Sequence, residues 1–215
     1  MAPNRPTRAP ATGCLFAICT ALALPGCASS YTLAPPRLDL EPHGRVALVT
    51  FEAGPGNERV AAYATERFAE IALANQPGVE VVELDAAALG LTSPMAENDG
   101  QAIAEAVKRV HEVSAVFVGD LSLSGVKPSG GLGSAGDARV SASVEADLAV
   151  RLVSVRSGGT LWRGRGGAVA GVGQARTGGG LPSVSFRDPS EAYDEAVNEA
   201  VVLATRDLRP TRVRE

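Results

Sequence analysis

The sequence predicts a single α/β domain in which helices flank a mixed β-sheet. Three observations carry this prediction: strand and helix patterns alternate over residues 45–123, apolar and polar residues alternate over 140–152, and a well-capped helix follows over 188–209. Alternating strands and helices produce parallel strands, whereas a strand with one polar face indicates antiparallel neighbours. The expected class is therefore α/β (α+β): one layered domain over residues 45–210, with a C-terminal β-hairpin and a final helix.

The first predicted unit is a strand, a helix and a second strand. The apolar run Arg45–Phe51 has the composition of a buried strand, and the turn Gly54–Asn57 follows it. Apolar residues then recur at helical spacing up to Gln76, where Pro77 and Gly78 end the helix. Val79–Glu83 predicts the second strand, with a short helix over 85–89 after it.

The next unit is a helix and a central strand. Residues 103, 106, 107 and 110 are apolar and share a helical face, with Asp99 as the expected N-cap. Ala115–Val118 is apolar throughout and becomes amphipathic from Asp120, as expected for a strand in the middle of a sheet. Gly125–Gly136 is rich in Gly, Pro and Ser and predicts a loop.

The clearest strand pattern covers residues 140–152. Its expected buried face consists of Val140, Ala142, Val144, Ala146, Leu148, Val150 and Leu152. The turn Arg156–Gly159 leads into Thr160–Arg163, which predicts a hairpin. Gly164–Leu181 is glycine-rich, and its pattern assigns no element.

The last helix has both ends specified. Asp188 is the expected N-cap, Pro189 takes the first helical position, and Glu191 completes a capping box. Pro210 is expected to stop the helix. Residues 211–215 are interpreted as a tail.

The first 26 residues have the layout of an export signal. Arg5 and Arg8 precede an apolar stretch over 14–24, which is shorter than the roughly 20 residues of a membrane span. Leu24-Pro-Gly-Cys27 resembles the bacterial lipobox, so Cys27 is the expected lipidation site. The alternative is an ordinary signal followed by a chance cysteine.

The remaining cysteines and the following segment refine this interpretation. Cys14 and Cys19 lie inside the signal, so acylation of Cys27 would leave the mature domain without a free thiol. Residues 27–44 are interpreted as the lipidated N-terminus and a proline-rich linker. Ala28, in the familiar sorting pattern, favours the periplasmic side of the outer membrane.

The charge balance excludes one class of partner. Without Arg5 and Arg8 the chain has 18 basic and 24 acidic residues, and aromatic residues are scarce. A nucleic-acid-binding surface needs basic residues to neutralise phosphates and aromatic residues to stack on bases. We therefore expect no nucleic-acid partner.

Three segments resemble the curli-secretion lipoprotein superfamily, which includes outer-membrane activators of penicillin-binding proteins. They are Arg45–Phe51, the pair Val79–Glu83 with Ala115–Gly119, and the hairpin Leu148–Trp162. The resemblance implies an α/β domain that acts as a secretion-pore subunit, an enzyme activator or another envelope protein. It brings no catalytic residue, so we expect a protein that is not an enzyme.

Two glycine-containing motifs could bind phosphate or another anion. Residues 131–136 spell GxGxxG, but a period-two strand follows, whereas the dinucleotide motif requires a helix. The turn Gly54–Asn57 precedes a helix N-terminus, which can bind an anion, although a plain connecting turn is the preferred interpretation. No cofactor is expected from either motif.

Titratable residues offer no clear active site. His43 falls in the linker and His111 ends a helix, and neither has the neighbours of a metal site. Glu145 and Asp147 share one strand face and could do acid–base chemistry, but a solvated face explains the pair equally well. No metal and no catalytic residue are predicted.

The expected function is a non-catalytic assembly or activator module that binds an envelope protein. The candidate contact surface is the polar side of the long strand, together with the 125–136 loop. Its residues are Ser141, Ser143, Glu145, Asp147 and Arg151. A subunit of an oligomeric, curli-type secretion pore is the alternative, because membrane-crossing strands also alternate apolar and polar residues. An envelope enzyme is the third hypothesis.

Overall fold

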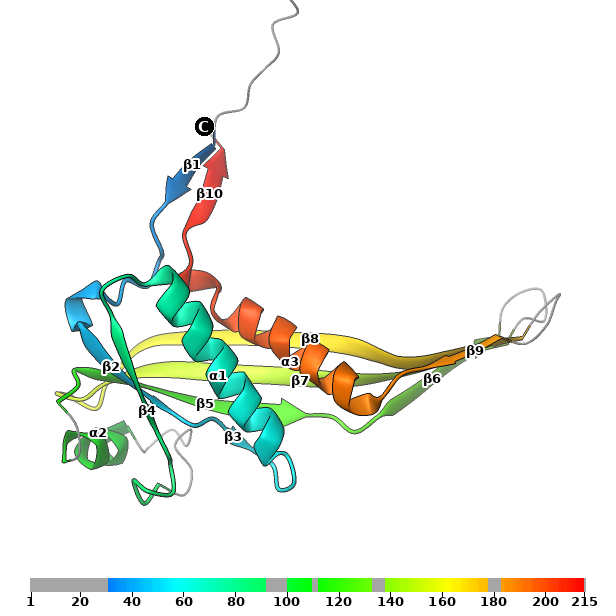
Figure 1. The fold of residues 1–215 in the computed structure, drawn as a ribbon, viewed down its shortest axis with the longest axis horizontal. Helices are drawn as coiled ribbons and strands as arrows, with labels where there is room; N and C mark the ends of the chain where they lie inside the picture. Colours follow the sequence, from blue (N-terminus) through cyan, green and yellow to red (C-terminus); the bar gives the residue numbers. More distant parts are fainter. Residues whose placement is uncertain (1–30, 92–99, 110–111, 133–137, 178–182, 215) are drawn as a thin grey trace, which may run out of the picture.

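An eight-stranded mixed sheet forms the centre of the fold (Figure 1). The computed structural model describes residues 31–91, 100–109, 112–132, 138–177 and 183–214. The signal, Cys27, Asp99, Val110 and His111 lie outside these residues. The α/β class predicted from the sequence is confirmed.

The parallel half of the sheet comes from alternating strands and helices. Strand β2 (Arg45–Val49) pairs in parallel with both β4 (Glu80–Leu84) and β5 (Ala115–Leu123). The two crossovers contain α1 (Glu58–Asn75) and α2 (Gly100–Lys108). A short strand, β3 (Glu52–Ala53), also pairs in parallel with β5.

The other half is antiparallel and is built on a long hairpin. Strands β7 (Ala138–Ser154) and β8 (Thr160–Thr177) pair along almost their whole lengths. The main strand order is β4-β2-β5-β7-β8-β9, with β9 at Ser183–Phe186, and β6 (Lys127–Leu132) pairs with β7. The predicted hairpin is therefore confirmed, and it is much longer than its sequence pattern indicates.

Helices cover both faces of the sheet unequally. Helices α1 and α3 (Pro189–Ala204) pack on one face over the larger apolar core, and α2 packs on the other face over a smaller one. Figure 1 shows α1 and α3 side by side. Arg67 Nε donates to Asn198 Oδ1 at 2.8 Å across these helices. The larger core contains a chain of edge-to-face aromatic contacts through Phe51, Phe68, Phe117 and Trp162.

Helix α3 lies unusually close to β8 because small residues face each other. The helix presents Ala192, Ala196, Ala200 and Ala204, all of them buried. A Cβ at Gly166 would lie 2.1 Å from the Ala200 carbonyl oxygen, and one at Gly164 would lie 2.5 Å from that of Ala204. Residues 164–181, which the sequence pattern left unassigned, are thus largely strand β8.

Two segments predicted to be irregular form a second, two-stranded sheet. Strands β1 (Tyr31–Ala34) and β10 (Thr211–Arg214) pair in antiparallel fashion, and we call them the ribbon. The prediction that 211–215 is only a tail is wrong, because Thr211–Arg214 finds a partner strand at the opposite end of the chain. The predicted linker is also partly folded, since Leu40 within it is fully buried.

The buried side chain of Gln76 binds the chain segments at the base of both ribbon strands. Its Oε1 accepts the Leu40 amide at 2.9 Å, and its Nε2 donates to the carbonyl oxygens of Leu38 at 2.9 Å and Leu208 at 2.8 Å. Short 3₁₀ turns, Glu41–His43 and Arg206–Leu208, lie beside these contacts. One residue at the end of α1 therefore fixes where both ribbon strands leave the body.

Several local predictions need correction. The short helix expected over 85–89 is a series of hydrogen-bonded turns. The loop expected over 125–136 contains strand β6, because its serines and glycines can pair with β7. Helix α3 begins as predicted, with Asp188 accepting from the Ser190 amide, but it ends at Ala204, well before Pro210. None of the helices in the described part of the chain has the length and apolar character of a membrane span.

Candidate interaction surface

The long hairpin extends beyond the helices and forms a four-stranded arm. The arm consists of β6, β9 and the segments that pair with them, residues 138–143 of β7 and 173–176 of β8. Figure 1 shows it projecting past the N-terminal end of α3. It is the part of the described sheet that no helix covers on either side.

One face of the arm is apolar and exposed. The registers place Pro128, Ala142, Gly173 and Phe186 in one row, and Gly130, Val140, Ala175 and Val184 in the next. Val140 is 53%, Val184 59% and Phe186 73% exposed. We call this the apolar arm face. It continues the helix-bearing face of the sheet, because β7 runs through both regions without an inserted residue.

A β-bulge in β8 places residues of this strand on the apolar arm face. The register shifts between Ala142 and Ser143, which leaves Val172 as the extra residue in β8. The bulge reverses the alternation of β8, so that Gly173 and Ala175 point to the apolar side. The Phe186 ring lies on Gly173, where a Cβ would come within 2.3 Å of the ring. A larger residue at position 173 would therefore have to displace this aromatic ring.

The opposite face of the arm is polar, and its two edges differ. Ser129, Ser141, Gln174 and Ser185 share one row on this face. Edge strand β6 contains Lys127 and Pro128, which both hinder pairing with another strand. Edge strand β9, with the sequence SVSF, contains neither a lysine nor a proline. Strand β9 is therefore the edge better suited to accept a strand from another chain.

The structure divides the five predicted contact residues into three groups. Ser141 and Ser143 lie on the polar face of the arm, Ser141 exposed and Ser143 half-buried. Glu145 forms an ion pair with Lys127 at 2.6 Å, and Asp147 is exposed further along β7. Arg151 is only 5% exposed, so it does not belong to an open surface. It lies near the end of β7, on the sheet face that bears the smaller apolar core and α2.

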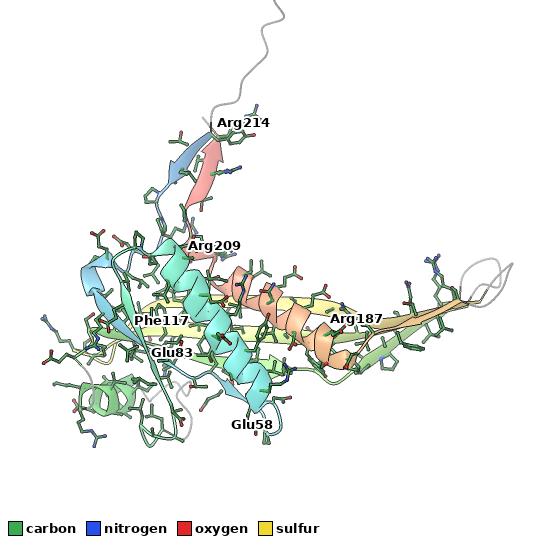
Figure 2. The ribbon with its side chains drawn as sticks, viewed as in Figure 1. Glu58, Glu83, Phe117, Arg187, Arg209 and Arg214 are labelled. Atoms are coloured by element: carbon green, nitrogen blue, oxygen red, sulfur yellow. The ribbon has the colours of Figure 1, made fainter. Side chains whose placement is uncertain are left out.

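Arg187 joins the arm to α3. Its Nε donates to the Gly171 carbonyl oxygen at 2.6 Å, and its guanidinium also binds Glu195. Figure 2 shows Arg187 where the arm meets the start of α3. A shallow depression of about 450 Å³ beside the bulge is lined by Ser141, Ser143 and Arg187, among other residues. Arg187 thus holds the bulge in place at the base of the arm.

A second depression lies at the carboxyl ends of the parallel strands and is acidic. Glu52, Asp85 and Asp120 line it, beside the start of α1. Hydrogen bonds from its own backbone amide and then from that of Gly56 hold the pKa of the Glu58 carboxyl below its usual value. The carboxylate accepts the Gly56 amide at 3.1 Å. This carboxylate already occupies an amide of the Gly54–Asn57 turn, which disfavours the anion site considered from the sequence. The described residues contain no group of three metal-binding side chains.

The sequence pattern missed the residues that dominate the apolar arm face. Val184 and Phe186 lie just beyond the unassigned glycine-rich stretch, in a strand of only 4 residues. The available signal was the alternation of Ser183, Val184, Ser185 and Phe186, which is that of a short edge strand. Its position beside β8 depends on the extension of β8 to Thr177, which the sequence pattern did not predict.

Comparison with known proteins gives only distant likenesses. No family model and no curated protein matches the sequence. Among solved structures, the PelC dodecamer from Paraburkholderia phytofirmans is 14% identical with a TM-score of 0.42, covering 85% of this chain and 99% of that one. Lipoprotein GNA1162 from Neisseria meningitidis is 19% identical with a TM-score of 0.32 and coverages of 59% and 83%. A putative lipoprotein from Caulobacter crescentus is 14% identical with a TM-score of 0.30 and coverages of 74% and 86%. These similarities include bacterial lipoproteins, but they are too low to assign a family.

Proposed function

We propose that this protein is a non-catalytic, lipid-anchored envelope lipoprotein that binds a protein partner through its arm. The exported, lipidated state rests on the signal pattern and on Cys27. The location on the periplasmic side of the outer membrane rests on Ala28. The binding role rests on the apolar arm face.

The exposure of this face is the observation that carries the proposal. Phe186 and Val184 of β9 and Val140 of β7 gather on one side of the arm. Burying apolar surface stabilises an interface by about 25 cal/mol per Å². A contiguous exposed apolar patch on an ordered element is typical of a protein-binding surface.

The partner that best fits this surface presents an extended apolar segment. Such a segment could add to the free edge of β9 through main-chain hydrogen bonds and place alternate side chains on the apolar arm face. Recognition of this kind needs no charged group at its centre, and the described apolar face contains none. The polar residues Ser141, Ser143 and Asp147 would remain on the opposite side.

In-cell photo-crosslinking tests the proposal. A photoreactive phenylalanine analogue at position 186 should form an adduct with another protein. The matched control is position 169, because Val169 is 62% exposed but projects from the opposite face of β8. Adducts of equal yield at both positions, or none at position 186, would refute the arm as the binding surface.

A pore subunit is the second candidate, and the same arm favours it. Two antiparallel hairpins that are apolar on one face and polar on the other have the pattern of membrane-inserted strands. However, β6 has 6 described residues and β9 has 4, whereas a crossing strand needs about 9–11. Adducts at position 186 that contain only this chain, in a stable ring-sized particle after detergent extraction, would favour the pore.

A further inference from the structure

The ribbon formed by β1 and β10 exposes nearly all of its side chains. Tyr31 is 64%, Leu33 67% and Val213 50% exposed, and only Ala34 is half-buried. A two-stranded sheet on its own is marginally stable in water. The ribbon is instead held from its base, where Gln76 binds both chain segments. It is therefore an ordered projection whose exposed surface is not explained by the fold of the body.

The register gives the two faces of the ribbon different chemistry. Directly opposed residues in an antiparallel pair project to the same side. Tyr31 opposes Arg214 and Leu33 opposes Arg212. One face thus combines an aromatic ring, a leucine and two guanidinium groups, and we call it the basic ribbon face. The other face consists of Thr32, Ala34, Thr211 and Val213, none of which is charged.

The charge of the ribbon contrasts with that of the whole chain. The chain carries a formal net charge of −4, yet β1 and β10 contain two arginines and no acidic residue. Neither Arg212 nor Arg214 forms an ion pair with a carboxylate in the described part of the chain. An anionic surface is the natural complement of such a face.

The position of the ribbon decides which anionic surface this is. Tyr31 follows Cys27 by four positions, so at most about 14 Å of extended chain can lie between them. Figure 1 shows the ribbon projecting away from the body in a different direction from the arm. Figure 2 shows Arg214 at its tip, and the register pairs Arg214 with Tyr31, the first described residue. If Cys27 carries a lipid, the ribbon tip must lie at the membrane surface.

We infer that the basic ribbon face binds anionic phospholipid headgroups and acts as a second membrane contact beside the lipid. This inference rests on the proposed lipidation of Cys27. Tyrosine is favoured at the headgroup level, and arginine can direct its charge to phosphates while its aliphatic stem lies on apolar surface. Because Gln76 fixes the base of the ribbon, such binding also sets how the body stands on the membrane. The arm then projects in a defined direction rather than turning freely about a flexible tether.

Photo-crosslinking to lipids tests this inference in the full-length lipoprotein. The protein is reconstituted into vesicles of phosphatidylglycerol and phosphatidylcholine, with a photoreactive residue at position 33 or, as a matched control, at position 213 on the other face. Position 33 should give the phospholipid adduct, and position 213 little or none. Vesicles of phosphatidylcholine alone, or high salt, should reduce the adduct at position 33.

A pair of double variants tests the role of the charges. Arg212→Gln with Arg214→Gln should shift the ribbon–surface equilibrium by about thirtyfold at low salt, which will reduce the adduct at position 33. Arg163→Gln with Arg165→Gln removes the same charge from exposed positions in β8 and should leave the adduct unchanged. Both double variants should keep the wild-type melting temperature.

The outcomes separate this inference from the anchor itself. Equal adducts at positions 33 and 213, equal effects of the two double variants, or a protein adduct at position 33 would each overturn the ribbon contact. Mass spectrometry of the Cys27 peptide reports lipidation independently. A lipid on Cys27 without the adduct at position 33 would leave the anchor standing and refute the ribbon contact. An adduct at position 33 without a lipid on Cys27 would refute the anchor alone.

Discussion

The two halves of β7 carry the same alternation of residues but have different surroundings. In the body half, Val144, Ala146 and Leu148 are buried beneath α3 and α1. In the arm half, Val140 continues the same face and is 53% exposed. Apolar periodicity therefore shows which side of a strand faces apolar neighbours, but not whether those neighbours belong to the same chain. Substitutions in the covered and uncovered halves should therefore differ in their effect on stability and binding.

Truncating a side chain should destabilise the body half far more than the arm half. Leu148→Ala leaves a cavity in the core and should lower the free energy of unfolding by about 2–5 kcal/mol. Val140→Ala should change it by less than about 1 kcal/mol, because the side chain is already half in water. Urea denaturation measures both. Comparable losses at the two positions would show that the arm is a stabilising part of the core.

Replacing a glycine with alanine should likewise change stability differently in the two halves of β8. Gly166→Ala pushes a Cβ against the Ala200 carbonyl oxygen of α3 and should destabilise the fold by about 1–3 kcal/mol. Gly171→Ala meets nothing within 4 Å. It should be neutral or stabilising by up to about 1 kcal/mol, because alanine restricts the unfolded chain. Thermal melting compares the two variants. A higher melting temperature for Gly166→Ala than for Gly171→Ala would contradict the close packing of α3 on β8.

The junction between arm and body should respond to pH through Asp188. The Ser190 amide, a hydrogen-bond donor to its carboxylate, lowers the pKa of Asp188 below the usual 3.8. Asp188 thus has a lower pKa in the folded state than in the unfolded state. The cap stabilises α3 fully above the unfolded-state pKa, and this stabilisation is lost as the pH falls through the folded-state pKa. Asp188→Ala should have a slightly lower melting temperature than the wild type at neutral pH. In acid the two melting temperatures should become equal.

The matched control for this prediction keeps the cap without the titrating group. Asp188→Asn can still accept a hydrogen bond, since asparagine is as good an N-cap as aspartate. Its melting temperature at neutral pH should stay near that of the wild type. A variant as unstable as Asp188→Ala would mean that the charge, rather than the hydrogen bond, stabilises the helix start.

The smallest expected change in stability is at the centre of the apolar arm face. Phe186→Ser should alter the free energy of unfolding by no more than about 0.5 kcal/mol, because the ring is 73% exposed. The same variant should lose the partner adduct when crosslinking is performed from position 184. Phe186→Leu keeps an apolar side chain and should retain the adduct. A large stability loss in Phe186→Ser would instead place this residue in the fold's own core.

Much of the body was predictable because its signals are local. The strands at Arg45–Val49 and Ala115–Leu123 and the cap at Asp188 each depend on residues close in sequence. The glycine-rich stretch was not predictable in this way. Two of its glycines, Gly164 and Gly166, allow α3 to approach β8 closely, and the helix meets them with an alanine stripe that comes later in the chain.

The candidate surface could be predicted only in part, for the same reason. Ser141 and Asp147 lie on the exposed polar side that the alternation indicates. Arg151 has the same parity but is buried, because local alternation does not determine which part of a sheet face distant segments cover. The apolar arm face combines residues from four strands, and its most exposed member, Phe186, gave no signal by itself.

By itself the sequence determined most of the periodic elements and their class, because these follow from neighbouring residues. Only the tertiary structure decided which half of β7 is covered and that Thr211–Arg214 pairs with Tyr31–Ala34. Both outcomes depend on contacts between distant segments, such as the three hydrogen bonds of Gln76. A local pattern fixes the direction in which a side chain points, whereas the packing of the whole chain determines what it meets there.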